Sequence, residues 1–210
     1  MRINSKAGRC KSLTCKELFS FILFVIRNRT KNIQYGKSLR ILGKLPIFKL
    51  PQNGKVILGN NVVLNSDFTN SNTSLTTKVK FVTGYTGIIT IGNNCDLNGT
   101  CMVAYNEIEI GDFCQFASST LISDTDFHPV SPEIRLKQMN GEKISFEAVG
   151  KEKIKLGKNV WVGWGAIILK GVEIGDHSIV AAGSVVLKGK YPDNALIAGN
   201  PAKVVKRYSK

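Results

Sequence analysis

Apolar residues recur at every sixth position over much of this 210-residue chain. Five segments also share a template in which an aliphatic residue and Gly precede a polar residue, any residue and a small or β-branched residue: 58–64, 91–97, 110–116, 156–162 and 174–180. Between these segments the period continues in three runs: Ile91, Leu97 and Val103; Ile110, Phe116 and Ile122; and Leu156, Val162, Ile168, Ile174, Val180 and Val186. An amphipathic helix repeats at three and four residues and a half-buried strand at two, so neither explains this spacing.

A period of six suits a chain that makes one short strand and one sharp turn and then repeats both. Three such units close a triangular coil of about 18 residues, and successive coils stack as parallel strands. Gly and Asn or Asp occupy the corners, where a positive φ costs least. Because the apolar residue of each unit points inward, stacking buries a continuous core that no single coil could bury. The sequence therefore predicts an all-β solenoid.

This pattern resembles the hexapeptide-repeat family of acyltransferases. It is most similar to sugar, capsule and O-antigen O-acetyltransferases and to galactoside and maltose acetyltransferases. The resemblance covers residues 56–205 and implies a left-handed parallel β-helix, an exception to the right-handed crossover preference. It also implies acetyl-CoA as the donor, a saccharide acceptor, and a homotrimer with active sites between subunits. Residues 1–55 are expected to form a short basic and helical extension, and the alternating apolar residues within 35–57 leave open an early, less regular coil.

The repeat is interrupted once in this interpretation. The period stops at Ile122 and resumes near Lys155. A long segment that leaves a regular solenoid is expected to carry function, because binding and catalytic residues concentrate on loops. We therefore predict one long catalytic loop over 123–155. Its polar start, Ser-Asp-Thr-Asp-Phe-His-Pro-Val at 123–130, contains one of only two histidines in the chain.

That histidine, His128, is the predicted general base, because imidazole is well suited to take a proton from a sugar hydroxyl near neutral pH. The acceptor oxygen then attacks the thioester without a covalent enzyme intermediate. Asp124 or Asp126 is expected to orient the ring, and the Asp-x-Phe-His-Pro string resembles the catalytic loop of galactoside and maltose acetyltransferases. We assign Asp126 to the catalytic group, and Asp124 and Arg135 to acceptor binding. His177 falls at a corner of a repeat and is predicted to be an exposed turn residue.

Two tryptophans follow the point where the repeat resumes. Trp161 matches a Trp-[Ile/Val]-Gly sequence that lines the catalytic pocket in the family, where its ring or N–H is expected to hold the acceptor or the thioester. An aromatic cap on a face of the prism is the structural alternative. Trp164 stands where the family more often has a small residue, and it either narrows the acceptor site or stacks on a sugar. The loop is several residues longer than in the galactoside enzymes of the family. This insertion, around 141–153, leaves acceptor specificity open.

Small residues within 181–188 and 197–205 are expected to form the donor site. They let the pantetheine arm lie along a coil, while nearby lysines meet the phosphates of coenzyme A. The Gly-Asn-Pro-Ala-Lys string at 199–203 matches the segment that borders the adenine site in sugar acetyltransferases. The predicted donor-site residues are Gly163, Ala181, Ala182, Ser184, Lys188, Pro201, Lys203 and Lys206. No metal site is predicted.

The net charge of +14 is concentrated near the N-terminus. Residues 1–55 hold 13 Lys or Arg and one acid, whereas residues 56–210 hold 16 Lys or Arg and 14 acids. The apolar run 18–26 is shorter than the roughly 20 residues that span a bilayer. It predicts a helix over 16–27 with basic flanks, which lies on an anionic membrane surface or packs on its own domain or a neighbouring subunit.

The charge has no companion signature of nucleic-acid binding, such as a zinc pattern or an RNP-like aromatic strand, so nucleic acid is not an expected partner. The apolar run also lacks the cleavage site of a signal peptide. The expected location is the cytoplasm, with the inner face of the membrane as a possibility. An odd number of cysteines fits a reducing compartment, in which all five act as small apolar residues: Cys10, Cys15, Cys95, Cys101 and Cys114.

The predicted function is transfer of acetyl from acetyl-CoA to a hydroxyl of a saccharide, such as a capsule, O-antigen or other surface glycan unit. The alternatives are N-acetylation of an amino sugar and acetylation of another small molecule, such as serine or an antibiotic. A loop histidine favours a hydroxyl acceptor, because an amine is already nucleophilic. A binding or assembly role without catalysis is disfavoured, because the chain keeps the histidine, the loop and the C-terminal string.

Overall fold

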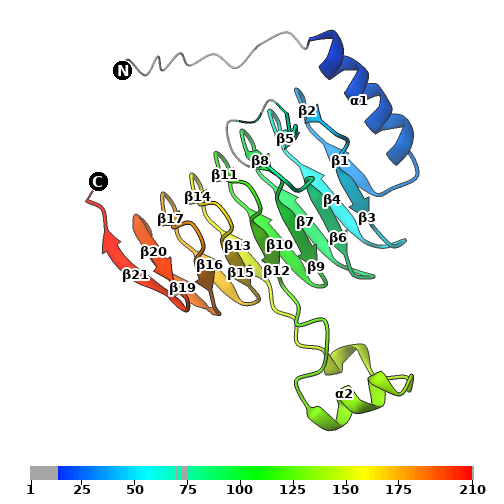
Figure 1. Cartoon of the computed structure of the whole chain (residues 1–210), viewed down its shortest axis with the longest axis vertical. Helices are drawn as coiled ribbons and strands as arrows, with labels where there is room; N and C mark the ends of the chain where they lie inside the picture. The colour runs from blue at the N-terminus through cyan, green and yellow to red at the C-terminus, as the bar shows by residue number, and fades with distance from the viewer. Residues whose placement is uncertain (1–13, 70, 72–74, 210) are drawn as a thin grey trace.

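The computed structural model describes residues 14–69, 71 and 75–209. Helix α1 (Cys15–Asn28) precedes a long stack of triangular coils, and a loop carrying helix α2 (Pro132–Met139) projects from the side of that stack (Figure 1). Each complete coil contributes one short strand to each of three sheets, which we call A, B and C in chain order. The coils are stacked in register, so the three sheets form the walls of a prism.

The strands within each sheet are parallel, except the last strand of sheet B, which is antiparallel. Sheet A contains β1 (Ile33–Tyr35), β4 (Lys55–Leu58), β7 (Ile88–Ile91), β10 (Glu107–Ile110), β13 (Ile154–Leu156), β16 (Val172–Ile174) and β19 (Gly189–Tyr191). Sheet B contains β2 (Arg40–Gly43), β5 (Val63–Ser66), β8 (Asp96–Asn98), β11 (Gln115–Phe116), β14 (Trp161–Val162), β17 (Ile179–Val180), β20 (Ala195–Gly199) and β21 (Ala202–Arg207). Sheet C contains β3 (Ile47–Lys49), β6 (Lys80–Thr83), β9 (Cys101–Ala104), β12 (Leu121–Ser123), β15 (Ile167–Leu169) and β18 (Val185–Val186).

The six-residue period forms the core of the prism, as predicted. All six members of the longest run are at most 3% exposed: Leu156, Val162, Ile168, Ile174, Val180 and Val186. Residues in equivalent positions of successive coils pair directly, as Ile122 does with Ile168 in sheet C. Each coil therefore buries its apolar residues against the coils above and below it, which explains why the period is so strict.

The prediction is wrong at Val103. Met102 and Ala104 belong to the core cluster, whereas Val103 does not. Met102 pairs with Ile122 and Phe81, so it occupies the inward column of sheet C. The turn before β9 is one residue shorter than its counterpart before β12, and Gly99 adopts a positive φ of 54° there. The shorter turn moves the inward position from residue 103 to residue 102.

The small position of each repeat forms a second buried column beside sheet B. Its members are Val62, Cys95, Cys114, Val160, Ser178 and Ala195, all at most 1% exposed. The contact with Cys114 and the effect of burial raise the pKa of the Cys95 thiol, which favours its neutral form. Cys95 and Cys114 therefore fill space as small residues, as predicted, whereas Cys15 is exposed and Cys10 lies outside the described residues.

The prism begins earlier than residue 56. Strands β1, β2 and β3 pair with β4, β5 and β6, so residues 33–49 form a first coil. Leu39, Ile41 and Phe48 of this coil are buried, and the Phe48 ring stacks on Phe81 of the next coil with a centroid distance of 5.0 Å. This coil departs from the template at Tyr35 and Leu39, which stand where the repeats carry an aliphatic residue and a small or β-branched residue. The boundary predicted at residue 56 is therefore too late.

Helix α1 matches the predicted helix over 16–27 and covers the N-terminal end of the prism (Figure 1). Thr14 caps it in a capping box with Glu17, and Glu17 forms an ion pair with Arg40 of β2. Burial opposes ionisation of Glu17, but hydrogen bonds from Thr14 and Arg40 outweigh it and lower the pKa of this carboxyl. Phe24 is buried against Phe48, so one face of α1 packs on its own domain.

The coils are interrupted at two places rather than one. The predicted excursion lies between β12 and β13 and contains α2 and a 3-10 helix (Phe146–Ala148). A second excursion, between β5 and β6, covers residues 67–79, of which 70 and 72–74 are not described. No repeat template falls between 65 and 90, so there is no six-residue period here whose loss would reveal this excursion.

Candidate active site

The loop between β12 and β13 is anchored by Asp124, which is fully buried. Its two carboxylate oxygens accept hydrogen bonds from the backbone N–H groups of Tyr105 (2.7 Å) and Asn106 (2.8 Å). Burial raises the pKa of Asp124, against the opposing effect of these hydrogen bonds. The side chain therefore holds the loop to the preceding coil and is not available to an acceptor, contrary to the sequence-based assignment.

Replacing Asp124 by alanine is expected to lower the free energy of unfolding by about 3 kcal/mol, because two backbone N–H groups lose their hydrogen bonds to a buried carboxylate. For a chain of this size the melting temperature then falls by roughly 6–12 °C. Thermal unfolding followed by circular dichroism measures the change, with exposed Glu133 on α2 replaced by alanine as the control. Equal melting temperatures for the Asp124 variant and the wild type would show that this anchor contributes nothing.

Asp126 does not contact His128, which it was predicted to orient. Its Oδ1 accepts a hydrogen bond from the Lys170 ammonium group at 2.9 Å, and the two residues form an ion pair. Its Oδ2 is buried and has no hydrogen-bond partner among the described residues. Lys170 lies at the end of β15, in the coil that follows the loop. Asp126 therefore fastens the start of the loop to the next coil.

Aromatic side chains support the loop just before His128. The Phe127 ring meets Tyr105 edge-on at 6.0 Å, and Tyr105 stacks on Phe146 at 5.9 Å. The ammonium group of Lys151 lies 3.6 Å from the centroid of the Phe146 ring. Phe127 has a φ of 63°, a conformation that costs energy for a bulky residue and persists only when its surroundings enforce it. These contacts fix the direction of the backbone that leads into His128.

His128 is exposed, and its Nδ1 lies 2.9 Å from Oε1 of Gln138. Ser131 caps α2, whose last turn carries Gln138 back to the histidine. Arg135, which was predicted to bind the acceptor, donates from Nη1 to the carbonyl oxygens of Pro129 and Val130 at 3.0 Å each. It thus stabilises the turn between the histidine and α2.

Gln138 is the residue that the sequence analysis missed. The signal was present, because Ser131-Pro132 is a typical helix start and Asn140-Gly141 a typical helix end. A helix between these signals advances only about 1.5 Å per residue, so it keeps residues 132–139 within reach of the segment before it. The sequence pattern predicts a loop without a helix here, and only Asp124 and Asp126 are named as groups that orient His128.

Trp161, Gly163 and Trp164 lie on another part of the prism. Trp161 is in β14 of sheet B, with its side chain 52% exposed, and Trp164 is at the following corner, 55% exposed. A Cβ on Gly163 would come within 2.5 Å of the Ala182 nitrogen, so only glycine lets these two coils stack at this corner. In this coil, the corner between sheets B and C therefore carries no large side chain except the indole of Trp164.

The predicted donor-site residues form two groups. Ala181 and Ala182 lie at the same B–C corner, one coil after Gly163, and the chain returns there through exposed Pro201 before β21, which carries Lys203 and Lys206. Ser184 differs from the prediction, because it is buried and its hydroxyl accepts a hydrogen bond from the Gly199 N–H at 3.2 Å.

Lys188 belongs to the other group. It lies at the corner between sheets C and A, where its ammonium group pairs with Glu152 at 2.6 Å. Glu152 is at the end of the loop between β12 and β13, and its N–H donates to the carbonyl of Asp124 at 2.9 Å. Lys188 therefore contributes to holding the loop in place and is separated from the small residues of the B–C corner.

His128 and the small-residue corner are separated within one chain. The loop leaves at the corner between sheets C and A, whereas Gly163–Gly165 and Ala181–Gly183 lie at the corner between sheets B and C. The intervening strands of sheet C, with about five residues from corner to corner, are about 16 Å long. The loop also projects away from the coils (Figure 1). A general base needs hydrogen-bond distance to its substrate, so one chain does not bring these residues together.

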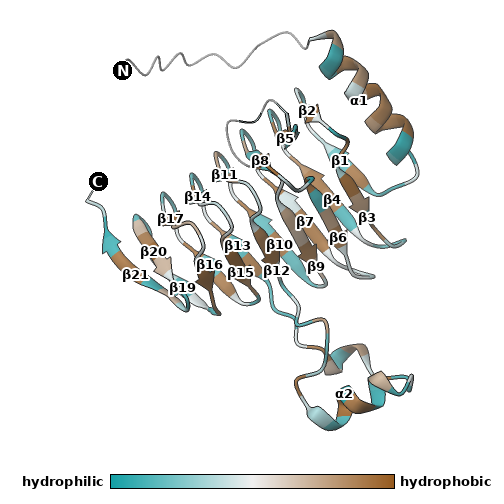
Figure 2. Cartoon of the chain, in the orientation of Figure 1, coloured by the Kyte–Doolittle hydropathy of each residue, from teal (hydrophilic) through white to brown (hydrophobic). Residues whose placement is uncertain are grey.

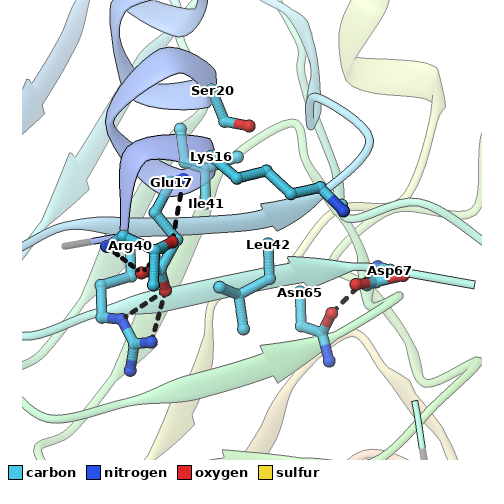
Figure 3. A pocket seen from close by; sticks show the side chains of 10 residues that line it. Lys16, Glu17, Ser20, Arg40, Ile41, Leu42, Asn65 and Asp67 are labelled. Atoms are coloured by element: carbon cyan, nitrogen blue, oxygen red, sulfur yellow. Dashed lines mark hydrogen bonds and ion pairs between the residues drawn. The ribbon is translucent and has the colours of Figure 1, made fainter. Parts of the chain in front are cut away.

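A cavity of about 450 Å³ lies elsewhere, between α1, β2 and β5 (Figure 3). Lys16, Ser20, Asn65 and Asp67 line it together with the ion-paired side chains of Glu17 and Arg40. This region belongs to the first two coils, whereas the histidine loop leaves the fourth. The cavity is a feature of the joint between α1 and the prism, and none of the predicted site residues lines it.

No cluster of three or more His, Cys, Asp or Glu side chains with metal-binding geometry lies within residues 14–69, 71 and 75–209. Over the same ranges, none of the helices combines the length and the apolar content needed to cross a bilayer.

The fold and the sequence repeat together are those of a hexapeptide-repeat β-helix. Residues 153–188 match the bacterial transferase hexapeptide family (six repeats). These residues cover the coils that follow the loop, where the six-residue period is most regular.

Among characterised relatives, the chain is 39% identical over 124 residues to galactoside O-acetyltransferase of Escherichia coli K12, covering 58% of this chain and 55% of the relative. It is 30% identical over 124 residues to the putative lipopolysaccharide biosynthesis O-acetyl transferase WbbJ of the same organism, covering 59% and 62%. The chain thus spans little more than half the length of these relatives. The predicted resemblance to hexapeptide-repeat acetyltransferases is confirmed.

Solved structures support the fold. The N-acyltransferase AntD of Bacillus cereus, in complex with dTDP and coenzyme A, aligns over 95% of this chain and 92% of its own with a TM-score of 0.62 and 24% identity. The acetyltransferase VCA0836 of Vibrio cholerae, in complex with acetyl coenzyme A, aligns over 62% and 66% with a TM-score of 0.52 and 27% identity. The prism is therefore the left-handed parallel β-helix that the resemblance implied.

Proposed function

We propose that this protein transfers the acetyl group of acetyl-CoA to a hydroxyl group of a saccharide. The observation that carries the proposal is an exposed histidine, His128, held by a hydrogen bond in a loop that projects from a hexapeptide β-helix. The similarity to galactoside O-acetyltransferase and to WbbJ supports an O-linked saccharide acceptor. The VCA0836 complex supports acetyl-CoA as the donor.

In the proposed reaction, Nε2 of His128 takes the proton of the acceptor hydroxyl as its oxygen attacks the thioester carbonyl. A carbon–oxygen bond forms, the carbon–sulfur bond breaks, and the coenzyme A thiolate leaves. The imidazolium then returns its proton to the sulfur, so the enzyme ends in its starting state. No group of the protein becomes acetylated.

We place the donor along the B–C corner of the last coils. The small side chains of Ala181 and Ala182 leave room for the pantetheine arm, and exposed Lys203 and Lys206 on β21 carry the charge that coenzyme A phosphates require. Trp161 and Trp164 are exposed beside this corner and offer flat faces to the acceptor sugar. These assignments leave Lys188 and Ser184 with structural roles.

We propose that the complete site forms between copies of the chain, in a homotrimer. Such a site brings His128 of one subunit to the donor corner of another, which a single chain does not do. The outer face of sheet C supports self-association, because a row of half-buried apolar residues runs along it in register: Cys101, Leu121, Ile167 and Val185. The outer face of sheet A instead carries ion pairs such as Lys153–Glu109.

A direct test uses matched acceptors, a methyl glycoside and the corresponding 2-amino sugar, with acetyl-CoA as the donor. The proposal predicts an acetyl ester, which hydroxylamine cleaves, on the methyl glycoside. An acetyl amide on the amino sugar, with no ester on either acceptor, would instead establish N-acetylation and contradict the hydroxyl assignment.

We further propose that α1 attaches the enzyme to an anionic membrane surface. Four side chains on the side of α1 that faces away from the prism are 38–63% exposed: Phe19, Ile22, Leu23 and Ile26. Figure 2 shows α1 apolar along its middle and polar at both ends. Basic Lys16, Arg27 and Arg29 flank the apolar face, as in helices that lie in the interface of an anionic bilayer. Because acetyl-CoA is a cytoplasmic metabolite, the membrane face concerned is the inner one.

Replacing Phe19, Ile22 and Ile26 together by serine is expected to weaken binding to anionic vesicles by more than about tenfold, because each buried apolar side chain contributes about 1.5–3 kcal/mol. Flotation with anionic and with neutral vesicles measures the effect. The matched control replaces exposed Leu136 and Met139 of α2 by serine. Unchanged vesicle binding of the α1 variant, or loss of self-association in its place, would show that this face has another role.

A further inference from the structure

His128 has a defined partner within its own loop. Its Nδ1 lies 2.9 Å from the carboxamide oxygen of Gln138, ten residues later in the chain. A carboxamide oxygen can only accept a hydrogen bond, so Nδ1 must carry the proton in this contact. Nε2 of a neutral ring is then left with its lone pair, in the state that a general base requires.

The contact is built by the loop rather than by chance proximity of two exposed side chains. Ser131 accepts a hydrogen bond from the Ile134 N–H at 3.4 Å, and Pro132 occupies the first turn of α2, so the start of the helix is fixed. Arg135 holds the turn between the histidine and the helix. At the other end, the Gly141 N–H donates to the carbonyl of Gln138 at 3.1 Å, and Gly141 has a φ of 80°.

The printed contacts of the carboxylates in this loop are with groups other than His128, although Oδ2 of Asp126 has no hydrogen-bond partner among the described residues. Asp126 pairs with Lys170 and Asp124 with two backbone N–H groups, while the guanidinium group of Arg135 donates to two carbonyls. Glu147 pairs with Lys151 at 3.0 Å. None of these contacts orients the imidazole, so Gln138 is the group in the described structure that selects its tautomer.

We propose that Gln138 is the positioning residue of the active site and keeps His128 in the Nδ1–H tautomer. A neutral partner performs the orienting task that an acid performs in most base–orienter pairs. An amide oxygen fixes the ring but stabilises its charged form less than a carboxylate does, so the neutral base is kept at lower pH than it would be beside a carboxylate. This inference rests on the proposed function for its catalytic meaning, but the tautomer is a property of the protein alone.

The tautomer is measured directly by nitrogen NMR of ¹⁵N-histidine-labelled protein at alkaline pH, where the ring is neutral. The chain has two histidines, so a His177→Asn background leaves one signal pair. Asparagine suits that corner, because Asn61, Asn94, Asn159 and Asn194 occupy the equivalent positions with positive φ. The expected result is a protonated Nδ1 in this background, and a shift toward the Nε2–H form that free histidine favours in Gln138→Met.

Activity gives the second readout. Gln138→Met is expected to lower kcat about tenfold with little change in KM, because one hydrogen bond that aligns the base is lost. Gln138→Glu keeps the acceptor, so it should retain the Nδ1–H tautomer and shift the acidic limb of the pH–rate profile upward by about one unit or more. Lys137→Met, a neighbouring exposed change on α2, is the matched control and should alter neither readout.

The outcomes separate this inference from the proposed function. A protonated Nε2 in the reference protein, or an unchanged tautomer in Gln138→Met, would overturn the role of Gln138 whatever the enzyme acetylates. The expected tautomer shift without saccharide acetylation would support the positioning role and contradict the proposed reaction.

Discussion

Replacing His128 by alanine reduces acetyl transfer about 10²–10⁴-fold in our expectation, the usual contribution of a general base. The loss should appear in kcat rather than in KM, because the acceptor and acetyl-CoA keep their other contacts. Folding should be unaffected, since His128 is exposed and the loop is held by Asp124, Asp126 and the aromatic contacts of Phe127. Steady-state kinetics with thiol detection measures the effect.

The control is the second histidine. His177 lies at an exposed corner with a φ of 60°, and its Nδ1 is 3.1 Å from the amide nitrogen of Asn159. His177→Asn should therefore leave kcat within about twofold of the wild type, because a surface change away from the site has little effect. If the His128→Ala variant turned over within a few fold of the wild type, His128 would not be the general base.

Two inactive variants are expected to restore activity when they assemble together. His128→Ala lacks the base, and Ala182→Trp fills the small-residue corner assigned to the donor. If each site combines the loop of one subunit with the corner of another, a mixed ring contains sites that take both intact parts from different chains. Random mixing of equal amounts makes about a quarter of the sites intact, so activity should rise to about 25% of the wild type.

The mixing experiment needs joint refolding or co-expression, because preformed trimers exchange subunits slowly. Each variant refolded alone serves as the control and should stay at its low activity. A mixture that gives only the mean of the two separate variants would mean that each chain builds its own site. That result would contradict the inter-subunit site without affecting the assignment of His128.

The regular part of the fold could be predicted because stacking makes every coil obey the same rule. All six members of the six-residue run from Leu156 to Val186 are buried. The predicted helix over 16–27 agrees with α1 within one residue at each end. The first coil could be predicted only as an alternative, because Tyr35 and Leu39 depart from the template at its corner, although Ser38 there still adopts a positive φ of 58°. A corner of this kind is recognised only when a following strand is seen to pair with it.

The site was harder to predict, because its contacts join residues whose separation follows no period. Asp126 stands two residues before His128, yet its partner Lys170 is 44 residues away in the next coil. Asp124 is predicted to bind the saccharide acceptor. It instead directly follows a buried strand, where its carboxylate accepts hydrogen bonds from backbone N–H groups at a corner of the preceding coil. Gln138 faces His128 only because α2 folds the loop back. The residue types of the loop predict a general base at His128, but they do not indicate which groups hold its ring.

The central claim is that this chain acetylates a saccharide hydroxyl with His128 as the base. The most direct measurement is release of free coenzyme A thiol from acetyl-CoA, against a panel of free sugars and bacterial surface polysaccharides, with His128→Ala beside the wild type. The account predicts saccharide-dependent thiol release by the wild type, a base-labile acetyl ester on the saccharide, and loss of both in the variant. Saccharide acetylation that persists in the variant, or acetyl transfer to amines alone, would contradict it.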